Sequence, residues 1–127
     1  MVDYSEWKKY SPVILRIGIA LVFLWFGISQ LTDPASWTSY VPLAVSQIVH
    51  PAIVVFINGV FEIICGLLLI SGLFTRVAAI LLGLHLIGII VGVGYNEIGV
   101  RDFGLMLAAF AIALSGPDTW CIRKSEW

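Results

Sequence analysis

An amide and a carboxylate stand one helical turn apart in the middle of an apolar stretch. Asn58 and Glu62 are four residues apart, so on a helix both side chains face the same way. The apolar run that carries them, residues 51–71, is about as long as a helix must be to cross a bilayer. A carboxylate at that depth is costly unless it is paired, protonated or next to a polar cavity. The face that carries Asn58 and Glu62 is therefore expected to contact other parts of the protein.

His85 and Arg16 are the expected partners of Glu62. At ~1.5 Å per residue, Glu62 and His85 are each roughly 15 Å from the short link that joins their two helices. Neighbouring antiparallel helices would then hold both side chains at the same level. Arg16 lies about one turn into the first apolar run, so its side chain either extends to the membrane surface or turns inward and pairs with a carboxylate. The sequence therefore allows an intramembrane polar cluster of Arg16, Asn58, Glu62 and His85.

This cluster has two interpretations, and the sequence leaves both open. In the functional one, a carboxylate and a histidine in a medium of low dielectric constant exchange a proton near neutral pH, as a quinone headgroup site or a proton path requires. Glu62 is then the candidate catalytic residue. In the structural one, the polar groups fix the register of packed helices. Neither Cys65 nor Cys121 has the spacing of a metal site, so no metal is expected, and no motif for a bound cofactor is present.

Three further charged residues fall near the ends of apolar runs. Arg101 and Asp102 form a polar pair of neighbours near the predicted outer face. Because adjacent residues of a helix point in different directions, their side chains need not pair with each other. Arg76 lies at the start of the third run, at the predicted inner interface.

A pattern of small residues follows His85. His85, Gly88 and Gly92 share one helix face, and glycines four residues apart are typical of surfaces where membrane helices touch. We therefore expect a helix contact at Gly88 and Gly92.

The elements that must position these residues are four apolar segments. Of the 127 residues, 60% are hydrophobic and only 12% are charged, which is about half the charged fraction of a soluble domain. The sequence therefore predicts an all-α membrane protein, a four-transmembrane-helix bundle formed by a single domain over residues 1–127. The segments span about 12–31, 51–71, 74–94 and 100–116. Residues 33–50, with their prolines and aromatic residues, are expected to form an outer interfacial loop.

The basic residues predict the orientation of the bundle. With four spans, six basic residues fall on one side and only Arg101 falls on the other. Basic residues are enriched on the cytoplasmic side, so both termini are expected to be cytoplasmic in a multi-pass protein of the plasma membrane. The formal net charge of −1 argues against nucleic acid as a partner. The six residues on the predicted inner side are Lys8, Lys9, Arg16, Arg76, Arg123 and Lys124.

The order of these motifs resembles a known family. The resemblance rests on Leu15-Arg16-Ile17, on the stretch from Asn58-Gly59-x-x-Glu62 through Ser71-Gly72-Leu73-Phe74-Thr75-Arg76 to Ala79, and on Arg101-Asp102-Phe103-Gly104-Leu105. Together they resemble the DoxX-like family of small four-helix membrane proteins, over about residues 12–120.

The resemblance implies a bundle in a prokaryotic plasma membrane. Some relatives are linked to sulfur and quinone chemistry, as the membrane subunit of thiosulfate:quinone oxidoreductase, and others to membrane-associated redox complexes. Matched to this sequence, the polar pattern of the family falls on Arg16, Glu62, Arg76, Arg101 and Asp102, whereas His85 is not part of that pattern.

Three functions follow as expectations. The first is an accessory, non-catalytic membrane subunit of a respiratory or other redox complex, in contact with the lipid bilayer and with larger subunits or with further copies of itself. The second is a quinone-reactive oxidoreductase subunit, with Glu62 as proton acceptor or donor and Arg16 or His85 orienting the headgroup. The third is a small proton-coupled oligomeric transporter. A quinone is the only ligand that these expectations name.

Overall fold

The computed structural model describes residues 4–123 and 127, and this part of the chain is built from helices and the turns between them. Four of the helices are long and apolar enough to cross a membrane, the first of them together with the short α1 that precedes it. The predicted all-α fold with four membrane-spanning helices is therefore confirmed, while the cytoplasmic position of the termini stays a prediction. In chain order the elements are α1 (Tyr4–Lys8), α2 (Ser11–Thr32), the 3-10 helix η1 (Pro34–Tyr40), α3 (Leu43–Ser46), α4 (Pro51–Ser71), α5 (Thr75–Val93) and α6 (Glu97–Ser115).

Proline and glycine set most of the helix boundaries. Pro51 occupies the first turn of α4, where a missing N–H costs nothing, and Nδ1 of His50 accepts a hydrogen bond from the N–H of Ala52. The helix ends at Gly72, whose φ of 78° is left-handed. The fourth span begins at Glu97 rather than near residue 100, because Oδ1 of Asn96 accepts a hydrogen bond from the N–H of Gly99 and caps the helix earlier.

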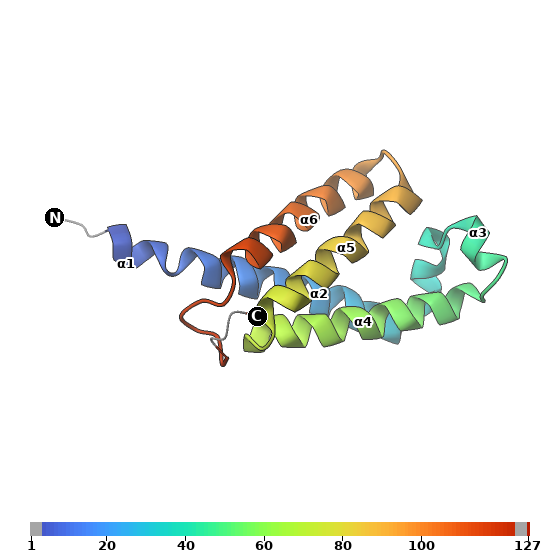
Figure 1. Ribbon diagram of the computed structural model, residues 1–127. Coiled ribbons are helices and arrows are strands. Elements are labelled where there is room, and N and C mark those ends of the chain that lie inside the picture. Colours follow the sequence, from blue (N-terminus) through green and yellow to red (C-terminus); the bar gives the residue numbers. More distant parts are fainter. Residues whose placement is uncertain (1–3, 124–126) are drawn as a thin grey trace.

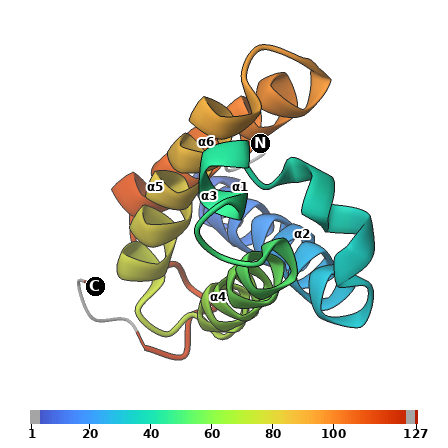
Figure 2. The ribbon, with the colours of Figure 1, turned by 90° about the vertical axis from the view of Figure 1, so that its right-hand side faces the viewer.

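The helices pack as two antiparallel pairs. α2 lies along α4 and α5 lies along α6, while contacts between the pairs are fewer. The pairs are close together at the end where α4 turns into α5, and they diverge toward the end that carries η1 and α3 (Figure 1). Seen from that end, η1 and α3 lie in front of the helix ends (Figure 2), and η1 packs on both α2 and α4.

Two glycines allow the close approach of α2 and α4. A Cβ atom on Gly27 would lie 2.8 Å from the carbonyl oxygen of Gly59, and a Cβ on Gly59 would lie 3.0 Å from the carbonyl oxygen of Gly27. The two backbones therefore touch directly, as small residues allow in membrane proteins. The Cβ of Gly59 would also lie 3.2 Å from Cβ of Gln30, so this contact brings Gln30 against α4.

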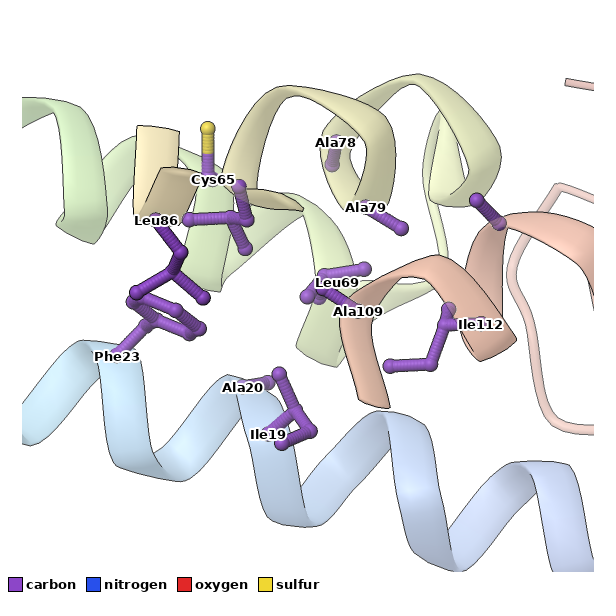
Figure 3. Packing of buried hydrophobic residues seen from close by; sticks show 12 residues of the cluster. Ile19, Ala20, Phe23, Cys65, Leu69, Ala78, Ala79, Leu86, Ala109 and Ile112 are labelled. Carbon is purple, nitrogen blue, oxygen red and sulfur yellow. The ribbon is translucent and has the colours of Figure 1, made fainter. Parts of the chain in front are cut away.

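The apolar core lies where the two pairs converge. Phe23 from α2 lies beside Leu86 from α5, and Leu69 from α4 lies near Ala109 from α6 (Figure 3). Leu69 and Leu82 are fully buried. Apolar side chains on the outer sides of the helices are exposed instead, as expected for surfaces that contact lipid.

The segment after α6 is held against the converging end by a buried ion pair. Nε and Nη2 of Arg16 donate hydrogen bonds to the carboxylate of Asp118 at 2.7 and 3.1 Å. Nη1 of Arg16 also donates to the carbonyl oxygens of Leu69 and Ile70 at 2.6 and 3.1 Å. The side chains of Arg16 and Asp118 are only 1% and 3% exposed. One arginine therefore joins α2, the end of α4 and the C-terminal segment.

The same arginine holds Asp118 in its ionised form. Burial by itself would raise the pKa of Asp118. The hydrogen bonds from Arg16 and from the N–H of Trp120, together with the positive charge of Arg16, nevertheless hold this pKa below its ordinary value. A carboxylate with a lowered pKa stabilises the folded state above its ordinary pKa and loses that contribution as the pH falls.

The glycine contact gives the first prediction. In Gly27→Ala the new methyl group would lie 2.8 Å from the backbone carbonyl oxygen of Gly59, so α2 and α4 must move apart. We expect the free energy of unfolding in detergent to fall by about 1–3 kcal/mol. Gly18→Ala in the same helix is the matched control, because none of the described residues comes within 4 Å of its Cβ, and it should be neutral or stabilising. Equal thermal stability of the two variants would contradict the close contact.

The ion pair gives the second prediction. Asp118→Asn leaves the buried guanidinium of Arg16 without a counter-charge, so the free energy of unfolding near neutral pH should fall by about 3 kcal/mol or more. The wild type should also lose stability as the pH falls below about 4, the ordinary pKa of an aspartate, because Asp118 takes up a proton more readily in the unfolded state. The variant should lose less. Thermal unfolding followed by circular dichroism at several pH values measures both effects.

A double variant provides the control for this prediction. Removing both charges in Arg16→Met with Asp118→Asn leaves no unpaired buried ion, so the double variant should be more stable than Asp118→Asn alone. Wild-type stability of the single variant at neutral pH would show that the pair does not hold the C-terminal segment.

Candidate functional site

A cavity of about 370 Å³ lies between the two diverging helix pairs. Side chains of α2, η1, α4, α5 and α6 line it, and most of its wall is apolar. Phe23, Phe26, Trp37 and Tyr40 contribute aromatic rings. An apolar cavity with a few polar groups is typical of a small-molecule site. The polar groups in the lining are the side chains of Gln30, Asn58, Glu62, His85, Arg101 and Asp102.

The carboxylate of Glu62 is held by two side-chain amides. Nε2 of Gln30 donates a hydrogen bond to Oε2 of Glu62 at 3.2 Å, and Nδ2 of Asn58 donates to Oε1 at 3.1 Å. Nδ2 of Asn58 also donates to Oε1 of Gln30 at 2.7 Å. Glu62 is 3% exposed and Gln30 is 5% exposed. The three side chains form one network that fixes the orientation of the carboxylate.

His85 faces the same carboxylate from α5. Its Nε2 lies 3.5 Å from Oε1 of Glu62, and its ring packs against Phe61 with a centroid separation of 4.7 Å. This Nε2 is buried and makes no hydrogen bond within the described part of the chain. Buried polar atoms nearly always have a partner, so Nε2 is available to an oxygen of a bound molecule or to water.

The structure brings together three of the four residues predicted to form the intramembrane polar cluster. Asn58, Glu62 and His85 meet at the cavity, but Arg16 does not, and the prediction that it joins them is wrong. The guanidinium contacts the carbonyl of Leu69, seven residues beyond Glu62 and thus roughly 10 Å from it along α4. Arg16 does turn inward and pair with a carboxylate, but that carboxylate belongs to Asp118 and not to Glu62.

Two residues of these networks were not predicted as site residues. Gln30 follows Arg16 by fourteen residues and therefore lies on the same face of α2, a signal that could have identified it as facing the other helices. Asp118 lies after the Gly116-Pro117 break, outside any periodic segment, and nothing in the sequence indicated its partner.

Arg101 and Asp102 pair with each other at the diverging end. Nε and Nη2 of Arg101 both lie 3.0 Å from Oδ1 of Asp102, because the long arginine side chain bends back over its neighbour. The guanidinium also lies over the ring of Phe26, 5.0 Å from its centroid. Asp102 is buried and Arg101 is half-exposed, and both residues line the cavity.

Arg76 lies far from the cavity, at the converging end. Its Nε donates a hydrogen bond to the carbonyl oxygen of Ala113 at 2.8 Å, and its guanidinium lies 5.6 Å from the ring centroid of Trp127. This residue therefore ties α5 to the end of α6. The predicted inner-side residue Lys124 lies outside the described residues.

Gly88 and Gly92 do not form the helix contact that their spacing predicts. Both line the cavity, and none of the described atoms comes within 4 Å of a Cβ built on Gly88. A Cβ on Gly92 would lie 3.1 Å from Cγ of Pro42. The glycine pattern therefore leaves open space beside His85 instead of bringing two helices together.

The geometry of the site limits its chemistry. A carboxylate, a histidine nitrogen without a partner and two amides converge on one region of an otherwise apolar cavity. Such a set can hold a polar headgroup and exchange a proton with it. Within residues 4–123 and 127, no group of three or more His, Cys, Asp and Glu side chains converges as metal ligands would.

Comparison with known proteins identifies the family. The model of the DoxX family matches residues 11–94. The uncharacterized membrane protein Rv3486 of Mycobacterium tuberculosis (strain ATCC 25618 / H37Rv) is 31% identical over 133 residues, which cover 90% of this chain and 80% of the relative. No solved structure shows significant similarity to this chain. The matched family model and this relative show that the chain is a multi-pass membrane protein that belongs to the DoxX family.

Proposed function

We propose that this protein is a quinone-binding membrane subunit of a redox complex, in which Glu62 and His85 exchange a proton with the headgroup. The observation that carries the proposal is the buried Nε2 of His85, which has no hydrogen-bond partner in the described part of the chain and lies next to the carboxylate of Glu62. A quinone-binding subunit needs the cavity, whereas a purely accessory subunit does not.

The donor set fits the oxygen of a quinone ring. Nε2 of His85 donates a hydrogen bond to a ring carbonyl when it carries a proton, and it accepts one from a ring hydroxyl when it does not. Around it, Phe23, Phe26 and Leu86 give the cavity an apolar wall suited to a ring. The amides of Gln30 and Asn58 keep the carboxylate turned toward His85, so a proton on Nε2 has an acceptor 3.5 Å away.

The protons and the electrons of quinone reduction come from different sources in the proposed function. Full reduction of a quinone requires two electrons and two protons. Glu62 and His85 supply the proton exchange at this site. Cys65 and Cys121 are both buried and lie in different parts of the fold, so no pair of thiols stands ready as an electron donor among the described residues. In this proposal the electrons come from a partner protein, and for that reason we propose a subunit of a complex.

The third prediction concerns the carboxylate. Glu62→Gln keeps the size of the side chain but cannot accept a proton, so quinone-dependent activity of the isolated complex should fall by about 100-fold or more. Glu97→Gln makes the same chemical change outside the cavity lining and should keep full activity. His85→Phe, which retains a ring against Phe61 but has no Nε2, should weaken binding of ubiquinone-1 in a calorimetric titration.

Two outcomes would contradict the proposal. Full activity of Glu62→Gln would leave the network of Gln30, Asn58 and Glu62 with a purely structural role. Unchanged quinone affinity of His85→Phe would show that Nε2 does not contact the headgroup.

The fourth prediction concerns partners. The protein, isolated from its native membrane in a mild detergent, should carry quinone and a fixed set of larger subunits with redox centres. Mass spectrometry of the isolated sample identifies both. Subunits without quinone would support the accessory function instead. A homo-oligomer with neither would favour the transporter.

A further inference from the structure

The wall of the cavity next to His85 is formed by Gly88, which has no side chain. His85 and Gly88 lie on the same face of α5, three residues and ~4.5 Å apart along the helix axis. Gly88 lines the cavity and is exposed to it, and a Cβ built there would meet none of the described atoms within 4 Å. One turn further on, the space in front of Gly92 is closed by the ring of Pro42. The open space thus extends from His85 past Gly88 and ends at Pro42.

We infer that the ring of the ligand lies directly against the backbone of α5 at Gly88, which makes Gly88 a specificity-determining residue. This inference rests on the proposed function, because it takes the ligand to be a planar ring with an oxygen on its edge. With that oxygen at Nε2 of His85, the body of the ring occupies the space in front of Gly88. Any side chain at this position would project into the same space.

Two other glycines provide a comparison within the same molecule. Gly18 in α2 and Gly104 in α6 also have no described atom within 4 Å of a built Cβ, but neither lines the cavity. A Cβ atom at any of the three positions has no described atom within 4 Å. Only at Gly88 would the side chain take space from a ligand.

The test compares Gly88→Leu and Gly88→Ala with Gly104→Leu, each purified as the full chain in detergent. Leucine and alanine favour helix over glycine, and their Cβ has room at these positions, so all three variants should fold. Circular dichroism and thermal unfolding verify this. The probes are ubiquinone-1 and menaquinone-1. Both carry the same short tail, but the headgroup of ubiquinone-1 has one ring and that of menaquinone-1 has two fused rings. Isothermal titration calorimetry measures their dissociation constants.

For each quinone that the wild type binds, Gly88→Leu should raise the dissociation constant by about 100-fold or more, and Gly88→Ala should raise it by less. Gly104→Leu should bind as the wild type does. If Gly88→Leu binds within about twofold of the wild type while His85→Phe has lost binding, the inference is overturned and the proposed function stands. If the wild type binds neither quinone, both fail.

Discussion

The burial of one carboxylate in the membrane region is the constraint on which the rest of the structure depends. Glu62 is 3% exposed in a helix that must cross apolar surroundings, so its oxygens need partners from the protein. Asn58 supplies one from the same helix, and Gln30 supplies the other from α2. Gln30 reaches α4 because Gly27 and Gly59 let the two backbones touch. The close packing of the first helix pair and the polar network are thus two parts of one arrangement.

The two ends of the bundle are built in different ways. At the converging end, α2, α4, α5 and α6 share an apolar core, and Arg16 binds both the end of α4 and Asp118. At the diverging end, the pairs separate, and η1 with its following turn lines the space between them. The closely packed converging end therefore holds the four helices together while the diverging end contains the cavity.

The sequence predicted the elements more reliably than the side-chain contacts. Length and hydropathy identify four spans because a bilayer requires about twenty apolar residues from each helix. Counting residues gives depth, and Glu62 and His85 lie at one level with 3.5 Å between their nearest atoms. Depth does not say which way a helix is rotated or which neighbour is closest. For that reason Arg16 was assigned the wrong carboxylate, and Gly88 was expected to touch a helix where it faces open space.

Phe23 and Leu86 belong both to the lining of the cavity and to the apolar core, so they form its floor. Beyond them, roughly 10 Å of closely packed apolar side chains separate Glu62 from the level of Arg16. In the proposed function, protons therefore reach and leave Glu62 through the cavity and not through the packed core.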